Sequence, residues 1–299
     1  MSWYSRVKKK VVFFTGDIHL LHSFPWVTWS IHRHYVDLGE IQEGMSEISH
    51  GDIGIHRDWG YLSNKFIPGF MKHGWIHVED NYLNNPMIVE AVSEGVVCRS
   101  AYYPMYSDYT IILSPKGVTD KDRRGACLKA KKIVGVEYDY DFKFDIDSEI
   151  KYYQGQNTDE ALNDLKIAGE NLSDGYDTKF SCTEVCAYSW WHQREKLNIK
   201  RKKFKNKLGQ SMDIIAADDF LNDAWEIKWM SASVDPDSAK KYRLHEAGMD
   251  IIADFRRQNP VKMRVWTNLG ESGASQAEKL KKQEENAEAE KPEQSSESV

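Results

Sequence analysis

The chain has 299 residues, of which 41% are hydrophobic and 12% aromatic. This length and composition fit one large globular domain or two smaller ones, and they exclude a wholly disordered chain. The formal net charge is −6, and residues 271–299 contribute −4 of it through eight Glu and four Lys. The remaining charge of about −2 on the body gives no case for nucleic acid or for a strongly acidic partner.

The four cysteines, Cys98, Cys127, Cys182 and Cys186, include no C-x-x-C pair and no dense disulfide framework. We therefore expect a reducing, cytoplasmic location. The basic triplet Lys8–Lys10 is followed by only four apolar residues, which is too short for a signal-peptide core or a membrane span. The sequence predicts no transmembrane segment, and it leaves the oligomeric state open.

An early segment, Gly16–His19, is similar to the Asp-x-His metal ligands of calcineurin-like phosphoesterases. Those enzymes need further Asp, Asn and His clusters downstream, and this chain has none in the required form. The histidines near it have no helical metal spacing, and residues 31–35 could alternate in a strand. We expect these histidines to be structural, and we predict neither a metal site nor a cofactor.

Short strands joined by tight turns are predicted between residues 51 and 115. Alternating or β-rich segments, separated by Gly, Pro, Asn and Ser turns, occupy residues 53–56, 73–79, 87–92, 96–99 and 108–113. The simplest arrangement is an antiparallel sheet. In the second strand, His73, Trp75 and His77 share one face, and Ile76 and Val78 share the other.

The remaining segments are more varied. A helix is expected from Thr119 or Asp120 to Gly135, with Ala126, Ala130 and Val134 along one face. Acidic and aromatic residues alternate over 136–145, a surface helix is expected over 159–170, a basic run spans 200–207, and a strand is expected over 225–230. From Glu271 onward the polar, aromatic-free composition predicts a disordered tail.

A reactive helix start is predicted at Ser181. Ser181 is a suitable N-cap, and Glu184 stands three residues later, as a capping box requires. Cys182 then falls in the first turn, where free N–H groups and the helix dipole favour a negative charge. Its thiol should ionise more easily than a free cysteine, and a thiolate is the nucleophilic form. The alternative is that Cys182 is a small, buried packing residue.

The order of these motifs resembles that of the permuted papain-like hydrolases of the NlpC superfamily, the YiiX/YaeF group. The matching pieces are Gly51–Ile53, Phe66–Phe70 followed by His73, Ile88–Ala91 followed by Glu94–Val96, Gly135 followed by Tyr138 and Asp139, and Phe180–Glu184. In ordinary papain-like enzymes the cysteine helix precedes the histidine strand, and here the order is reversed. The chain departs from the family around His73, where Lys72, Gly74 and Trp75 stand.

The resemblance implies an α+β fold, a circularly permuted papain-like (NlpC-type) domain. Its antiparallel sheet or partial barrel would pack against the helix that bears Cys182. The corresponding domain would cover residues 51–232. Residues 1–50 and 233–270 would be extensions with open roles, and residues 271–299 would be the tail.

The same resemblance implies a thiol hydrolase. Cys182 would attack a carbonyl, His73 would move the protons, and a third polar group would orient the imidazole. Glu90, on the next strand, fits the third role better than His77, which lies about 13 Å along the strand from His73.

Three further residues are assigned to substrate binding: Tyr138, Trp75 and Asp52. One of the oxyanion donors would be the backbone N–H of Cys182. Tyr138 could equally be a core aromatic residue, and Trp75 either narrows the site or faces the core.

The expected substrate is a peptide, a peptidoglycan peptide or a lipid-like molecule with an amide or ester bond, and transfer to an acceptor other than water stays open. The main alternative is a papain-like binding module that has lost its activity and that contacts a peptide, a lipid or an anionic partner. The run 200–207 is a solvated basic face on a near-neutral body, which is weak evidence for nucleic acid. A zinc site of Cys182, Cys186 and His192 lacks a fourth ligand.

Overall fold

A computed structural model describes residues 18–20, 27–29, 35–58, 64, 67–81, 83–139, 179–205 and 211–261. The contact pattern separates residues 1–259 from residues 260–299, and the account below concerns the first unit. Among the described residues no helix is long and apolar enough to span a membrane.

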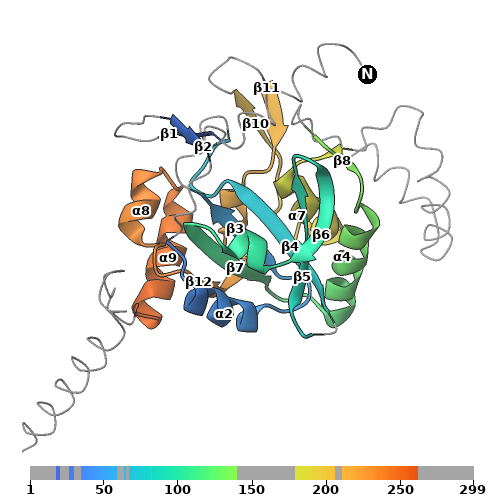
Figure 1. Ribbon diagram of the computed structural model, residues 1–299, viewed down its shortest axis with the longest axis horizontal. Coiled ribbons are helices and arrows are strands. Elements are labelled where there is room, and N and C mark those ends of the chain that lie inside the picture. The colour runs from blue at the N-terminus through green and yellow to red at the C-terminus, as the bar shows by residue number, and fades with distance from the viewer. Residues whose placement is uncertain are drawn as a thin grey trace, which may run out of the picture. The chain divides into compact units, whose positions relative to one another are not determined.

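A six-stranded antiparallel sheet forms the centre of this unit (Figure 1). Its spatial order is β12 (Trp225–Met230), β7 (Tyr109–Pro115), β3 (Ile53–Arg57), β4 (His73–Asp80), β5 (Pro86–Val92) and β6 (Gly95–Ser100). Every neighbouring pair is antiparallel. The predicted α+β class with an antiparallel sheet is therefore confirmed, and the predicted strands lie within a residue or two of the observed ones.

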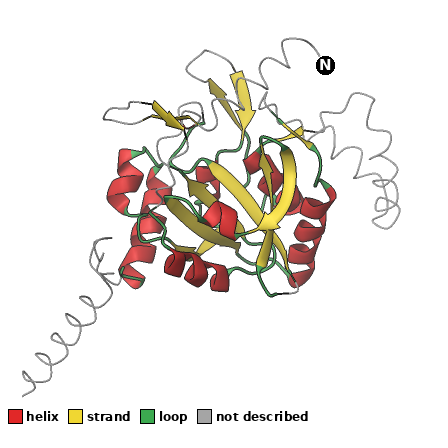
Figure 2. Ribbon diagram, viewed as in Figure 1, coloured by secondary structure: helices red, strands yellow, loops and turns green. Residues whose placement is uncertain are grey.

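Helices cover both faces of the sheet (Figure 2). On one face, α7 (Cys182–Trp190) and α4 (Asp120–Lys132) enclose the larger apolar core with sheet residues such as Ile53, Ile76 and Val89. The other face buries Trp75, Ile88 and Ile112 against α2 (Leu38–Glu47) and the short α3 (Tyr102–Met105). The alternation along β4 explains this division, because successive side chains point to opposite faces.

The helix that begins after Thr119 is shorter than the apolar spacing suggests. The Thr119 hydroxyl caps the backbone N–H of Asp122, and Ala126 and Ala130 are buried as expected. Val134 is 41% exposed, because the helix ends at Lys132 and the chain turns at Gly135, where φ is +94°. Val134 therefore does not share the buried face, which corrects the prediction.

Segments on both sides of residues 51–232 pack into the two apolar clusters that flank the sheet. Ile41 of α2 is buried in the cluster that contains Trp75, and the neighbouring Glu40 accepts a hydrogen bond from the N–H of Ala232. Near the other end, α8 (Pro236–Lys241) and α9 (Glu246–Gln258) bury Leu244 and Ile252 in the larger core. The packed unit thus extends beyond the boundaries that the resemblance implies.

The remaining elements are short pairs of strands and single helical turns. They are β1 (Ile18–Leu20) with β2 (Val27–Trp29), β8 (Glu137–Tyr138) with β9 (Lys179–Phe180), β10 (Lys202–Lys205) with β11 (Ser211–Ile214), and the 3-10 helices η2 (Trp191–Gln193) and η3 (Ala217–Phe220). Part of the basic run therefore forms β10. The predicted surface helix at 159–170, the tail from 271 and most of 136–145 lie outside the described residues.

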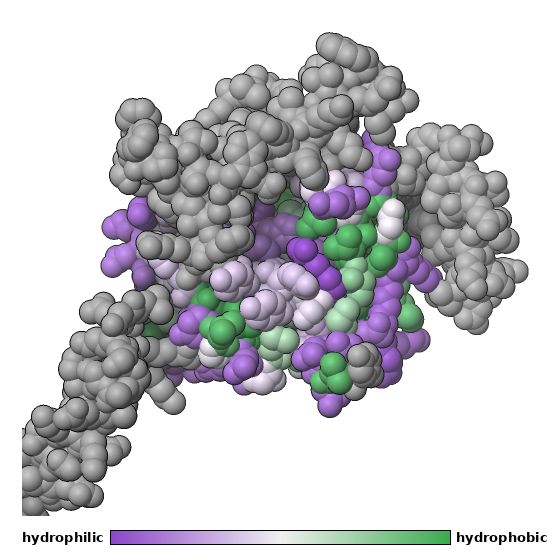
Figure 3. All heavy atoms as spheres, in the orientation of Figure 1, coloured by the Kyte–Doolittle hydropathy of each residue, from purple (hydrophilic) through white to green (hydrophobic). Residues whose placement is uncertain are grey.

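On the face of the molecule in Figure 3, apolar side chains lie in separate groups among polar ones. Large exposed apolar or aromatic residues include Leu38, Leu83 and Tyr103. In the described part of this face, no single apolar patch dominates.

Candidate active site

The helix start that carries Cys182 has the predicted cap. Ser181 has an extended backbone at the N-cap, and its N–H donates to Oε2 of Glu184 at 2.6 Å. Cys182 is the first helical residue, and its side chain is almost fully buried. The sulfur therefore lies in the first turn, close to backbone N–H groups with no partner inside the helix.

Helix α7 approaches the beginning of β4 very closely. A Cβ atom at Gly74 would lie 3.2 Å from Sγ of Cys186 and 3.6 Å from Cα of Thr183. Glycine after His73 thus lets the helix start reach the strand that carries the histidine. The close approach is therefore the physical reason for a glycine at position 74.

Cys182 lies beside the backbone on both sides of His73. Its Sγ is 3.8 Å from the carbonyl oxygen of Lys72, to which the thiol can donate a hydrogen bond while it is protonated. The N–H of Gly74 also contacts the sulfur. Pairing between β4 and β5 begins only at Trp75 and Glu90, so ahead of that pair the edge of β4 is available to Cys182.

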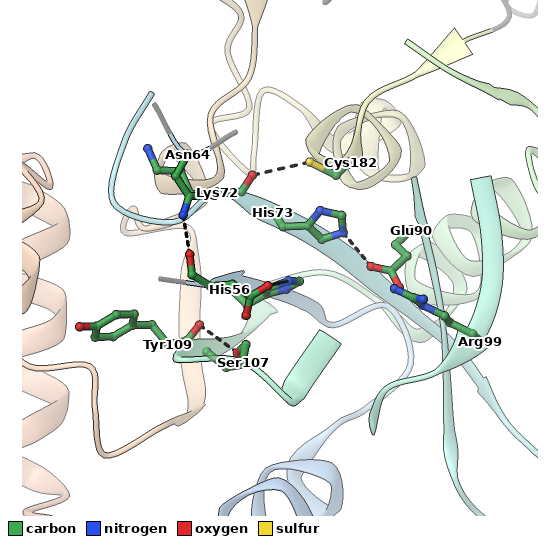
Figure 4. A network of polar contacts seen from close by, with 11 residues as sticks. His56, Asn64, Lys72, His73, Glu90, Arg99, Ser107, Tyr109 and Cys182 are labelled. Carbon is green, nitrogen blue, oxygen red and sulfur yellow. Dashed lines mark hydrogen bonds and ion pairs between the residues drawn. The ribbon is translucent and has the colours of Figure 1, made fainter. Parts of the chain in front are cut away.

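His73 and Glu90 meet across these two strands. The imidazole Nε2 is 2.7 Å from Oε2 of Glu90, a residue with no exposed surface. The other carboxylate oxygen, Oε1, accepts a hydrogen bond from Nε of Arg99 on β6. Figure 4 shows the imidazole between Cys182 and Glu90. Because Nε2 is used by the carboxylate, Nδ1 is the nitrogen left for the thiol.

Cys182, His73 and Glu90 lie in a row, and the charges in this row stabilise one another. Burial alone would raise the pKa of the Cys182 thiol, but the nearby His73 lowers it below its ordinary value through its charge and a hydrogen bond. Burial opposes protonation of His73, yet Cys182 and Glu90 together raise its pKa. Burial also opposes ionisation of Glu90, while His73 and then Arg99 lower its pKa to about 2. These shifts all act in the direction of a thiolate, an imidazolium and a carboxylate.

Other residues beside His73 did not stand out in the sequence. The ring of His56, opposite His73 on β3, lies 4.7 Å from the His73 ring between centroids. Nearby, burial and then Asp108 raise the pKa of Asp58 to about 7. Strand alternation in Ile53–Arg57 could have indicated His56, but nothing local links it to His73.

Asp218 is a further residue that no local pattern indicates. Its two carboxylate oxygens accept hydrogen bonds from the N–H groups of Phe70 at 2.5 Å and Met71 at 2.7 Å. It also fills the space where a Cβ at Gly69 would lie, and Gly69 has φ +89°. Asp218 therefore holds the turn that leads into His73.

Of the residues implied for substrate binding, Trp75 and Asp52 have structural contacts. Trp75 is fully buried, with its ring over Gly54, where a Cβ would clash with it. Asp52 is also fully buried and forms an ion pair with Arg123 at 2.8 Å and a hydrogen bond with Ser114. Neither side chain presents surface to a substrate, which corrects that expectation. Trp75 faces the core.

Tyr138 lies next to the row of Cys182, His73 and Glu90, whereas His77 lies away from it. Tyr138 is half-buried and pairs with Phe180, two residues before Cys182, so it borders the helix start. His77 lies toward the other end of β4, where Nε2 is 3.1 Å from Asp80 and the ring is 5.1 Å from that of His50. The structure therefore brings together Cys182, His73 and Glu90, and it does not bring His77 to them.

The described residues contain no group of three or more His, Cys, Asp or Glu side chains that could hold a metal ion, and Cys182, Cys186 and His192 form no such group. Sγ of Cys186 donates to the carbonyl oxygen of Cys182, while the ring of His192 stacks on Trp190. Burial raises the pKa of Cys186 well above its ordinary value, so its thiol stays protonated.

Compared with known protein families, curated proteins and solved structures, the chain has no significant match. The geometry places a thiol at a capped helix start, an imidazole and a buried carboxylate next to one another. A nucleophilic cysteine requires groups of these three kinds.

Proposed function

We propose that the protein is a cysteine hydrolase or acyltransferase of the permuted papain-like kind, which attacks the carbonyl carbon of an amide or ester. The observation that carries this proposal is the row of Cys182, His73 and Glu90, in which the ionised thiol is favoured. The order of the five sequence motifs, which resembles that of the permuted papain-like hydrolases, also supports the proposal.

In the first step the Cys182 thiolate forms a bond to the carbonyl carbon, and the carbonyl π electrons move onto the oxygen. The backbone N–H of Cys182, free at the helix start, would be one donor to this oxyanion. As the oxyanion collapses, the bond to the leaving amine or alcohol breaks. The His73 imidazolium gives that group its proton, which leaves a thioester on Cys182.

In the second step neutral His73 takes a proton from water or from another acceptor. The resulting nucleophile attacks the thioester and releases the acyl group, and the thiolate and the imidazolium are restored. Glu90 holds the Nε2 side of the imidazole in both steps, so Nδ1 remains directed at the reacting atoms. The substrate would be a peptide, a peptidoglycan peptide or a lipid-like amide or ester.

A library of fluorogenic amides and esters, incubated with the wild-type protein and with Cys182→Ala, tests this proposal. We expect turnover that is lost in Cys182→Ala and kept in Cys186→Ala. The matched cysteine lies one turn further along the same helix and has a protonated, buried thiol. Turnover that survives in Cys182→Ala would contradict the proposal. A thiol that reacts no faster than a free one would instead favour an inactive binding module.

A further inference from the structure

The terminal nitrogens of Arg99 lie beside the candidate site. Its Nε donates to Glu90, and among the described residues neither of its terminal nitrogens, Nη1 or Nη2, has a hydrogen-bond partner. Its side chain is 37% exposed, whereas Glu90 is buried. A guanidinium that is fixed at one edge and open at the other can bind a second carboxylate in a bidentate way.

Tyr103 supports this guanidinium from α3. The Cζ atom of Arg99 lies 5.2 Å from the centroid of the Tyr103 ring, and Tyr103 is 61% exposed. Such a cation–π contact holds the plane of the guanidinium. Because Nε and one face are both held, Arg99 would lose less conformational freedom on binding a ligand than an unrestrained surface arginine.

The open end of Arg99 is near the proposed reacting atoms. Glu90 contacts His73 through one oxygen and Arg99 through the other, so a single carboxylate separates the guanidinium from the imidazole (Figure 4). A carbonyl carbon attacked by Cys182 would lie beside His73. A group a few bonds away from that carbonyl could then reach Arg99.

We propose that Arg99, supported by Tyr103, forms a subsite for a carboxylate on the substrate. This inference rests on the proposed function, because it names the substrate class of the same site. The substrates would be amides or esters with a free carboxylate a few bonds from the scissile carbonyl. Arg99 acts in two ways, since Nε positions Glu90 and the terminal nitrogens bind the substrate.

Two thiol reagents of equal length test the subsite, 4-maleimidobutyrate and its neutral amide. The rate at which each modifies Cys182 is followed by mass spectrometry of the Cys182 peptide at low ionic strength. The measured quantity is the ratio of the two rates. Any loss of Glu90 support in an Arg99 variant slows both reagents, and the ratio cancels that effect. Arg124→Gln, on the exposed side of α4, makes the same charge change elsewhere and is the matched control.

We expect the ratio of carboxylate to amide to be about tenfold higher in the wild type than in Arg99→Gln, as one charge-assisted contact predicts. Arg99→Lys should keep part of the preference, and Arg124→Gln all of it. Equal ratios in the wild type and Arg99→Gln would overturn the subsite and leave the proposed function standing. If neither reagent modifies Cys182 faster than glutathione at the same pH, the proposed function fails and the subsite with it.

Discussion

Nε2 of His73 lies 2.7 Å from Oε2 of Glu90, across two paired strands and 17 residues of chain. The Glu90 carboxylate thereby holds the side of the imidazole that faces away from Cys182. Arg99 holds the other oxygen of Glu90 and helps to keep the carboxylate ionised. The row is continuous from the thiol to the surface, so a change at one member should be measurable at the thiol.

Glu90→Gln should weaken the imidazolium without removing the imidazole. The amide carries no charge, so the pKa of His73 should fall and the pKa of Cys182 should rise. We expect alkylation of Cys182 near pH ~6 to slow by roughly tenfold, which corresponds to a pKa shift of about one unit. The effect should be smaller than that of His73→Ala, because Glu90 acts on the thiol through the histidine.

The matched control for Glu90 is His77→Gln, because His77 is the other candidate for the third role and lies at the far end of β4. Its pH profile for Cys182 alkylation should match that of the wild type. A larger effect at His77 than at Glu90 would contradict the assigned roles.

Gly74→Ala should separate α7 from β4. The new Cβ would lie 3.2 Å from Sγ of Cys186, so the helix or the strand must shift by a few tenths of an ångström. We expect a loss of about 1–3 kcal/mol in the free energy of unfolding, as for other overpacked core sites. Slower alkylation of Cys182 should accompany it.

A compensating change tests the reason for the Gly74→Ala effect. Cys186→Ala removes the sulfur that the new methyl group meets, so the double variant should recover part of the stability and of the Cys182 reactivity. Denaturant unfolding of the four proteins gives the coupling energy directly. Strict additivity would show that the close approach at Gly74 is not the cause.

Glu184→Gln should change how stability depends on pH. Burial and then Asp139 raise the pKa of Glu184 to about 8, and its Oε1 has no hydrogen-bond partner among the described residues. A folded-state pKa above the unfolded one means that this residue contributes stability at low pH. That contribution is lost as pH rises from about 4.5 through about 8.

The glutamine variant can keep the bond from the Ser181 N–H and does not titrate. The free energy of unfolding of the variant, minus that of the wild type, should therefore increase by roughly 1 kcal/mol or more as the pH rises from 5 to 9. Urea unfolding at three pH values measures this difference. A difference that is constant with pH would show that the Glu184 pKa is not raised.

Local patterns in the sequence predict much of the fold. Period-two alternation and turn residues give β3 to β7, and the Ser181 and Glu184 spacing gives the start of α7, because each signal lies within a few residues. The convergence of His73, Glu90 and Cys182 is predicted only by the resemblance to a family, since no short-range pattern joins β4 and β5 to a helix that begins about 90 residues after β5 ends.

Other parts of the site depend on contacts that one sequence does not carry. Arg99 reaches Glu90 because β6 pairs with β5 in the register that sets Arg99 opposite Ile88. Asp218 holds backbone groups 148 and 147 residues away. Trp75 shares a strand face with His73, but α2 and α3 cover that face further along β4, so Trp75 is buried while the His73 ring keeps part of its surface.

The pH dependence of Cys182 alkylation by iodoacetamide, in the wild type and in His73→Ala, tests the central claim most directly. Because the pKa of Cys182 is lowered and that of His73 is raised, the thiolate should persist near pH ~6, well below the free-thiol value of about 8.5. In His73→Ala the reactivity should move to higher pH, by about one unit or more, while Cys186 stays unreactive in both proteins. Equal labelling of Cys182 and Cys186, with a profile that His73→Ala leaves unchanged, would contradict the account.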